Sequence, residues 1–375
     1  MAVLTEEQTM LRDAAKGWAS ESAPVGALRK LRDGKSGRSF DPAAWAEMGQ
    51  MGWAGVIVPE DYDGSAFGYL GLGLILEETG RTLAASPLLS TAMIAASALQ
   101  LGGSNTQKSA WLPRIAAGAA VATLAIDEGS HHNPARTALT ATKGGSGYVL
   151  NGTKTFVLDG EAADLLIVAA RTSGDGADGL TLFLVPGDAP GVNRTHLSLL
   201  DSRGAARIAF DSVEVGADAV LGEVDKGWAV LEPVLDRAYA GLAAEMLGSA
   251  SAAFDITLEY LKTRTQFGQV IGTFQALQHR AAKWFTDLET TRSCVEAALE
   301  ALDAGNDTRA LASLAKAKAS ELVHLASNEM VQMHGGIGMT DAHDAGLFMK
   351  RARVTEALFG SASFHRDRYA RLMGF

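Results

Sequence analysis

The chain has 375 residues, which is more than one ordinary hydrophobic core accommodates, so its length predicts two or three domains. Apolar residues make up 47% of it and charged residues 20%, the balance of a soluble globular protein. The 33 basic and 43 acidic residues leave a net charge of −10, which argues against a nucleic-acid partner. Cys294 is the only cysteine, so an intrachain disulfide and a cysteine-based metal site are excluded.

The first residues predict an amphipathic helix rather than an export signal. Leu4, Leu11 and Trp18 belong to a set of apolar residues at helical spacing, and acids stand where a secretory signal would be basic. The longest apolar stretches are shorter than the roughly 20 residues that span a bilayer. We therefore expect a cytoplasmic protein without a membrane span, and a single cysteine suits a reducing compartment.

Residues 1–120 are predicted to be helical, with breaks at loops rich in Pro, Gly and Asp such as 58–68. A mostly buried helix is expected within 70–87, where the adjacent acids Glu77 and Glu78 precede a glycine. The run "GLGLIL" is the nearest approach to a dinucleotide fingerprint. Because it lies inside this apolar helix, we reject that interpretation.

Residues 121–225 have a different texture. The stretches 147–160, 164–172, 180–188 and 206–215 are short β-rich runs between Gly, Asp and Asn turns, which predicts an antiparallel β domain. Asn151-Gly152 is the clearest hairpin signal among them. Strands and helices do not alternate, so a doubly wound nucleotide-binding fold is not expected.

From residue 226 three long patterns rich in Ala and Leu, separated by short breaks that contain Gly, predict a helical bundle. The expected fold class is therefore α+β and multi-domain. It has an N-terminal α-helical domain (1–120), a middle antiparallel β domain (121–225) and a C-terminal helical bundle (226–375).

Two stretches carry a resemblance to a known family. "RTQFGQVIGTFQALQHRAA" (264–282) and "QMHGGIGM" (332–339) closely resemble two signatures of the flavin-dependent acyl-CoA dehydrogenases. Weaker matches, among them "LTEEQ" and "LEETGRTLA", follow in the family's order, and the likeness covers essentially the whole chain. It implies the same α, β, α order with a C-terminal four-helix bundle, an FAD cofactor and a role in fatty-acid or sterol side-chain degradation.

The resemblance also implies partners and a cofactor site. The partners would be an acyl-CoA substrate, an electron-transfer flavoprotein or similar acceptor, and further subunits in a homo- or hetero-oligomer, a dimer or tetramer. An arginine at the position of Arg264 binds the flavin pyrophosphate, usually of a neighbouring subunit, and its planar fork suits phosphate. In isolation Arg264 would be a surface arginine and the glycines a helix stop, but the surrounding motif favours the flavin. The residues assigned to the cofactor are Arg264, Gln266, Phe267, Gln275, Gln332, Gly335, Gly336, Phe156 and Ser361.

The reaction implied is α,β-dehydrogenation of an acyl-CoA thioester, in which a carboxylate takes the α-proton and the β-hydride passes to flavin N5. Counted without gaps from Gly335, the family's commonest base position falls on Phe359, which cannot accept a proton. The Phe359 main-chain N–H could still polarise the substrate carbonyl. Glu356 lies one helical turn earlier and fits a surface or structural acid better.

Some family members carry the base on the first long helix of the C-terminal domain, where this chain has Asp236 followed by Arg237. We take Asp236 as the candidate catalytic base and Arg237 as a candidate substrate contact, with Glu245 as a weaker alternative. The competing interpretation is an Asp–Arg surface pair. Aspartate is one methylene shorter than glutamate, and about 1 Å of misplacement can cost roughly a hundredfold in rate.

The chain departs from the family on the flavin-ring side. Asp127 replaces the usual threonine, Leu158 lacks the usual hydroxyl, and Phe156 keeps the aromatic ring. The chain thus keeps the residues that would contact a neighbouring subunit's flavin, but loses several that would contact its own flavin ring. This combination would suit a non-catalytic partner subunit of a heteromeric dehydrogenase. That is the alternative function, and an oxidase on the same fold is a third.

Two further groups of residues receive structural interpretations. Adjacent side chains diverge, so His131 and His132 are expected in a flexible loop rather than a metal site. A basic group near the C-terminus is expected to form a solvated face rather than to bind CoA phosphates. Its members are Lys350, Arg351, Arg353, Arg366, Arg368 and Arg371.

Overall fold

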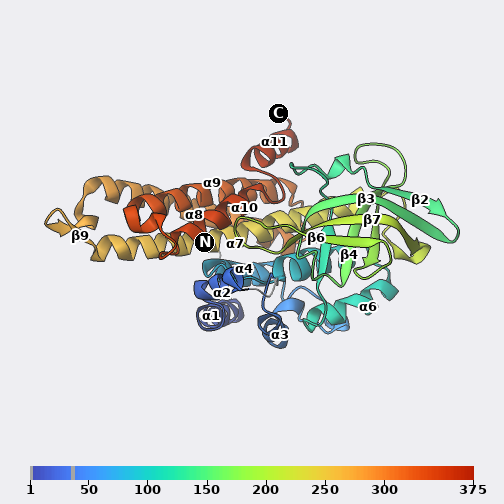
Figure 1. Cartoon of the computed structure of the whole chain (residues 1–375), viewed down its shortest axis with the longest axis horizontal. Coiled ribbons are helices and arrows are strands. Elements are labelled where there is room, and N and C mark those ends of the chain that lie inside the picture. The colour runs from blue at the N-terminus through green and yellow to red at the C-terminus, as the bar shows by residue number, and fades with distance from the viewer. Residues whose placement is uncertain (1–2, 35–38) are drawn as a thin grey trace. The chain divides into compact units, whose positions relative to one another are not determined.

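The computed structural model of the chain describes residues 3–34 and 39–375 (Figure 1). Its internal contacts divide the chain into two compact units. Met1–Lys30, Gly73–Ala84 and Tyr239–Phe375 form the first, here called the bundle unit. Leu31–Leu72 and Ala85–Ala238 form the second, the sheet unit.

The bundle unit is built from helices at both ends of the sequence. They are α1 (Glu6–Glu21), most of α2 (Val25–Asp33), the second half of α4 (Tyr69–Arg81), most of α7 (Trp228–Thr263), α8 (Gln275–Asp303), α9 (Arg309–His334), α10 (Ala345–Ala357) and α11 (Ala362–Leu372). Local chemistry explains where α1 begins, because the Thr5 hydroxyl accepts from the Gln8 N–H and the Gln8 side chain accepts from the Thr5 N–H. The helical N-terminal and C-terminal regions expected from the sequence are confirmed.

Inside the bundle unit, α4 and α7 cross at glycines. A Cβ placed on Gly248 would lie 1.8 Å from the Glu77 carbonyl oxygen, and one on Gly80 would lie 2.2 Å from the Glu245 carbonyl oxygen. Both are closer than any real Cβ contact. The two backbones can therefore approach this closely only because neither glycine has a side chain.

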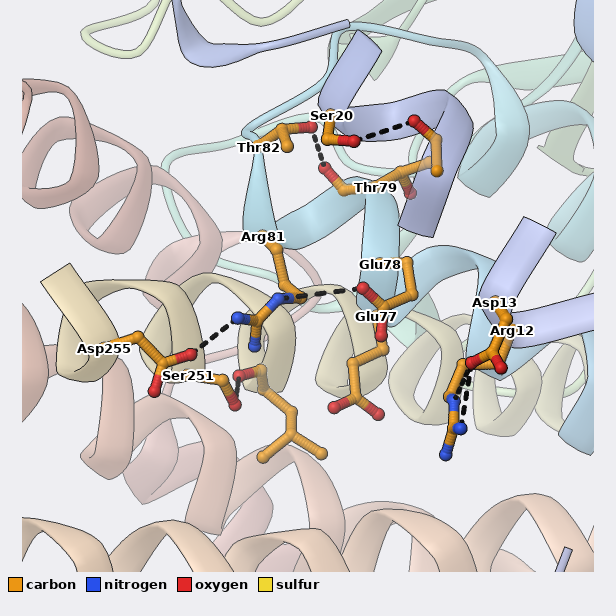
Figure 2. Close-up of polar contacts among 12 residues, drawn as sticks. Arg12, Asp13, Ser20, Glu77, Glu78, Thr79, Arg81, Thr82, Ser251 and Asp255 are labelled. Carbon is orange, nitrogen blue, oxygen red and sulfur yellow. Dashed lines mark hydrogen bonds and ion pairs between the residues drawn. The ribbon is translucent and has the colours of Figure 1, made fainter. Parts of the chain in front are cut away.

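The adjacent acids Glu77 and Glu78 stabilise the same crossing. Arg81 lies between Glu78 and Asp255, with nitrogen–oxygen distances of 3.6 and 2.6 Å (Figure 2). Glu77 accepts from Arg292 of α8 at 2.6 Å. Burial raises the pKa of Glu78, and the nearby Arg81 opposes that rise. Arg81 therefore ties α4 to α7, and Glu77 ties α4 to α8.

The sheet unit contains α3 (Pro42–Gln50), α5 (Ala96–Gly102), α6 (Asn105–Ala116), the π-helical segment η3 (Leu88–Ala95) and one sheet. The strands of the sheet are β1 (Ala122–Ala125), β2 (Thr140–Gly144), β3 (Gly147–Leu158), β4 (Leu165–Arg171), β5 (Leu180–Pro186), β6 (Val192–His196), β7 (Ala205–Gly216) and β8 (Val220–Leu221). Seven of them run in the order β6-β7-β3-β2-β4-β5-β8, and β1 pairs with β4. Most pairs are antiparallel, as the sequence predicts, while β4 pairs in parallel with β1 and β2.

The predicted Asn151-Gly152 hairpin is wrong, because β3 continues through both residues. The β3–β7 register shifts between Leu150 and Gly152, so this dipeptide marks a β-bulge. Gly152 has a φ of +144°, and a Cβ there would lie 2.9 Å from Leu139. Packing against Leu139 therefore explains the glycine, and the chain turns instead between β2 and β3, at residues 144–147.

Within residues 3–34 and 39–375, none of the helices has both the length and the apolar content that crossing a bilayer requires.

Candidate functional site

The arginine motif forms the end of a helix and a small hairpin in the bundle unit. Helix α7 ends at Thr263, and Arg264 leads into β9 (Thr265–Gln266) and β10 (Gln269–Val270), which pair antiparallel. Phe267, at the hairpin tip, has a left-handed φ of +56°. A bulky residue with a left-handed φ is uncommon.

The structure brings the two signature stretches together at this end of the bundle unit. Leu261 and Ile271, which flank Arg264, pack in one buried cluster with Met333 from the end of α9. The Tyr260 ring lies 4.4 Å from the His334 ring, centroid to centroid, and its hydroxyl donates to the His334 carbonyl oxygen at 3.5 Å. Segments about 70 residues apart in sequence therefore form one surface.

That surface is open to solvent. Phe267 is 90% exposed, and Ile337 and Met339 of the segment η7 (Gly335–Met339) are 42% and 78% exposed. The predicted cofactor residues of this region are all exposed: Arg264, Gln266, Gln275, Gln332, Gly335 and Gly336. A guanidinium, three amide side chains, an aromatic ring and bare glycine backbone form a donor set that fits a pyrophosphate and a planar ring system.

His334, which precedes the double glycine, was missed by sequence reasoning. Its Nδ1 donates to the Met330 carbonyl oxygen at 2.7 Å, and the side chain is buried. Within the described chain its Nε2 has no hydrogen-bond partner. Burial lowers the pKa of His334. Gly335 follows with a φ of +62° and ends α9.

Phe359, at the expected base position, lies in a strained turn between α10 and α11 of the bundle unit. Phe359 has a φ of +55° and Gly360 a φ of +99°, and the Phe359 side chain is buried. Ser361 then caps α11, its hydroxyl accepting from the Phe364 N–H. Glu356 does not serve this turn, because its carboxylate pairs with Arg353 at 2.7 Å and with His324 at 3.3 Å.

Two buried basic side chains support this turn, and sequence reasoning identified neither. Lys316 Nζ donates to the Gly360 carbonyl oxygen at 3.1 Å, and His365 Nε2 lies 2.9 Å from the Phe359 carbonyl oxygen. Both side chains are fully buried. Burial lowers the pKa of the Lys316 ammonium to about 7, against a weaker opposing effect of Glu356.

Asp236 lies on α7 in the sheet unit and is only 2% exposed. The alternative interpretation, an Asp–Arg surface pair, is therefore wrong. Arg237 binds elsewhere: its Nε donates to the Tyr69 hydroxyl at 2.8 Å, and its guanidinium lies 5.0 Å from the centre of the Tyr69 ring. An arginine over an aromatic face is held in a defined orientation.

Glu245, the other acid considered on α7, has a structural role in the bundle unit. Its carboxylate accepts from Arg351 at 3.2 Å, and both side chains are buried. Arg351 also donates to the Leu83 carbonyl oxygen at 3.4 Å. Because its carboxylate is committed to the buried Arg351, Glu245 is a weaker candidate base than Asp236.

The loop 126–134 in the sheet unit takes part in two polar pairs, each of a buried basic side chain with a partly buried carboxylate. His132 Nδ1 lies 2.9 Å from the Asp127 carboxylate, and Lys154 Nζ lies 2.7 Å from that of Glu128. Burial lowers the pKa of Lys154 to about 8, and Glu128 opposes the shift. The expectation of a flexible loop is wrong for His132, because its side chain is buried against Asp127.

Phe156 lies two residues after Lys154 on the same strand, β3. The β3–β7 register shifts again between Lys154 and Val157, and Phe156 adopts a φ of +53° with 44% of its surface exposed. The bulge turns an aromatic side chain out of the sheet to solvent. Leu158 is buried, and neighbouring Asp159 accepts from the Ser90 hydroxyl at 2.6 Å.

The basic group near the C-terminus is largely committed to protein partners. Arg353 pairs with Glu356, Arg366 with Glu321 and Arg371 with Asp367. Arg368 donates to the Arg309 carbonyl oxygen and the Ser313 hydroxyl. Arg351 is buried, so the expectation of a solvated face is wrong for that residue.

Comparisons with known proteins cover the whole chain. Three family models match in order: acyl-CoA dehydrogenase N-terminal domain at residues 5–119, middle domain at 123–213 and C-terminal domain at 225–374. The chain is 31% identical over 371 residues to a probable acyl-CoA dehydrogenase, YngJ, of Bacillus subtilis, covering 97% of each protein.

Solved structures give the same result. Butyryl-CoA dehydrogenase from Megasphaera elsdenii matches with a TM-score of 0.93 and 26% identity, over 100% of this chain and 99% of that one. A chain of the ChsE4-ChsE5 complex from Mycobacterium tuberculosis matches with a TM-score of 0.91 and 27% identity, over 100% of both chains.

Proposed function

Because this chain belongs to the acyl-CoA dehydrogenase family and is an FAD-dependent oxidoreductase acting on CH–CH bonds, we propose that it α,β-dehydrogenates an acyl-CoA thioester with Asp236 as the base. The observation that carries this assignment is the burial of Asp236, at 2% exposure, beside an Arg237 oriented by Tyr69. The alternative acids Glu245 and Glu356 are held in ion pairs with Arg351 and Arg353.

FAD, when bound, supplies the hydride acceptor. Arg264 would hold its pyrophosphate, Gln266, Gln275 and Gln332 would line the dinucleotide with Phe267, and Gly335 and Gly336 would let the backbone approach the adenosine part. Phe156 and Ser361 would contact the flavin half. The exposure of Arg264 and Phe267 supports this assignment, because a residue lent to a neighbouring subunit's cofactor must be accessible on the isolated chain.

Phe359 and Asp236 would have the two remaining roles in the reaction, stabilising the thioester carbonyl and removing the α-proton. The Phe359 main-chain N–H would donate to the thioester carbonyl oxygen and stabilise the negative charge that develops on it. The Asp236 carboxylate would take the α-proton. Arg237 would contact the acyl-CoA. An electron-transfer flavoprotein or a similar acceptor would then reoxidise the enzyme.

The test is to purify the chain alone, measure FAD per chain from its visible spectrum, and assay oxidation of straight, branched and steroidal acyl-CoA thioesters with an artificial electron acceptor. The proposal predicts near-stoichiometric FAD and formation of the 2-enoyl-CoA from at least one substrate. A flavin-loaded chain that oxidises none of them would contradict it.

One combination of features favours a second function. The surface that carries Arg264 and Phe267 is highly exposed, and Phe359 stands where the catalytic base is commonest in the family. In this alternative the chain is a non-catalytic subunit that completes a neighbour's FAD site. The structural likeness to a chain of the ChsE4-ChsE5 complex supports it. Its prediction is a chain that holds little FAD alone and gains it when its partner is co-expressed, as a hetero-oligomer in place of a homo-oligomeric dimer or tetramer.

A further inference from the structure

The turn at Phe359 and Gly360 is held from inside by two basic side chains that donate to consecutive carbonyl groups. Lys316 on α9 serves Gly360 and His365 on α11 serves Phe359, at 3.1 and 2.9 Å. A carbonyl oxygen only accepts hydrogen bonds, so the His365 Nε2 must carry a proton in this contact. Two donors from two different helices therefore determine the orientation of two neighbouring peptide planes.

The conformation that they hold is one the chain would not adopt by itself. Phe359 is a bulky residue with a φ of +55°, which is sterically unfavourable. Gly360 has a φ of +99°, and a Cβ there would lie 2.5 Å from the Phe364 ring. A backbone in sparsely populated conformations persists only where its surroundings impose it, and such positions cluster at functional sites.

Lys316 is completely buried, at 0% exposure. Its Nζ is enclosed by the Gly360 carbonyl and by the Ser320 hydroxyl, the latter at 3.0 Å. Burying an amine away from water is unfavourable whether it is charged or forced to be neutral. The same enclosure excludes Lys316 from touching a substrate. Its effect on any reaction must therefore pass through the turn.

We infer that Lys316 is a positioning residue, which by holding the Gly360 carbonyl sets the turn that directly follows the Phe359 N–H and presents the Ser361 N–H to the substrate. A trans peptide is planar, so fixing the Gly360 carbonyl toward Lys316 points the Ser361 N–H to the opposite side. His365 fixes the preceding peptide in the same way, and the Gly360 N–H bonds back to the Ala357 carbonyl oxygen at 3.2 Å. The catalytic part of this inference rests on the proposed function.

The test compares Lys316→Met with Lys318→Met in the FAD-loaded protein. Methionine reproduces most of the lysine stem but cannot donate, while Lys318 lies two residues further along α9 and is partly exposed. Hydrogen–deuterium exchange of the peptide covering 358–365 reports the turn directly. Steady-state kinetics separate kcat from KM. Should Lys316→Met fail to fold, Lys316→Gln takes its place, because its amide nitrogen is one atom nearer the backbone and cannot hold the Gly360 carbonyl as Nζ does.

The expected result is faster exchange confined to 358–365 in Lys316→Met, with kcat lowered about tenfold or more and KM changed little, while Lys318→Met resembles the wild type. Unchanged exchange at the turn would overturn the inference. Faster exchange with an unchanged kcat would also overturn it, since the turn would then not serve the reaction. A wild-type protein inactive on every thioester contradicts the proposed function instead, and in that case the exchange data alone decide whether Lys316 holds the turn.

Discussion

Tyr260 and His334 lie with their ring centroids 4.4 Å apart, and this contact joins the segment before Arg264 to the segment before Gly335. Each stretch carries part of the cofactor site proposed above. The buried cluster of Leu261, Ile271 and Met333 supports the same junction. The surface is therefore a product of packing between the ends of α7 and α9.

Replacing Tyr260 tests whether the junction serves cofactor binding. Tyr260→Leu keeps an apolar side chain but loses the ring contact and the hydrogen bond to the His334 carbonyl. Because an aromatic pair contributes about 0.5–1.5 kcal/mol, we expect a several-fold weaker FAD affinity in fluorescence titrations, with little change in helix content. Phe285→Leu, on the exposed side of α8, is the control. Equal affinities for the two variants would contradict the expectation.

The planar guanidinium of Arg264 allows a more specific test of FAD binding. Arg264→Lys keeps the charge but loses the bidentate geometry, so we expect FAD to bind about tenfold more weakly or worse. Lys262→Gln removes an exposed cation that pairs with Glu259 at 2.6 Å, and should leave the affinity unchanged. If both variants weaken FAD binding equally, the site recognises net positive charge only.

The close approach of α4 and α7 predicts a large effect of one methyl group. Gly248→Ala would place a Cβ 1.8 Å from the Glu77 carbonyl oxygen, so we expect the free energy of unfolding to fall by at least about 2 kcal/mol. Gly17→Ala is the matched control, because no atom lies within 4 Å of its added Cβ. In that position of α1, alanine should stabilise the protein by about 0.5–1 kcal/mol. Denaturant unfolding of both variants provides the measurement.

The pH dependence of stability follows from the buried lysines. Lys316 has a pKa of about 7 in the folded protein and a reference value of 10.5, so between these the unfolded chain binds more protons. The free energy of unfolding therefore gains a contribution that rises with pH through this window. We expect Lys316→Met to lose that contribution and to show a shallower rise than Lys318→Met between pH 7 and 9. Parallel curves for the two variants would mean that Lys316 has an ordinary pKa.

The order of helices and strands follows from local periodicity, and the sequence therefore predicts it well. The Asn151-Gly152 hairpin failed because the same dipeptide also suits a bulge, and the contact of Gly152 with Leu139, thirteen residues earlier, decides between them. A local turn pattern such as Asn-Gly does not predict that contact. The expectation for His132 failed for a related reason, since its side chain is buried in a contact with the Asp127 carboxylate.

The residues of the candidate site also include some that the sequence predicts and some that only the packing reveals. Arg264, Gln332 and Phe359 stand in stretches whose spacing resembles a family pattern, so they could be identified from the sequence. Lys316 could not, because it lies 44 residues before Gly360 within an ordinary helical pattern and gains its meaning only when α9 packs against the turn. His365 is likewise defined by a contact with a main-chain oxygen, which no side-chain pattern reveals.

The most direct test of the central claim is the rate of flavin reduction after rapid anaerobic mixing of the FAD-loaded protein with an acyl-CoA that it oxidises. Asp236→Asn removes the proposed base with almost no change in shape, so we predict a rate lowered at least about a hundredfold, with FAD content retained. Glu356→Gln, which alters an acid paired with Arg353, should reduce at the wild-type rate. An Asp236→Asn protein that reduces as fast as the wild type would contradict the assignment of Asp236 as the base.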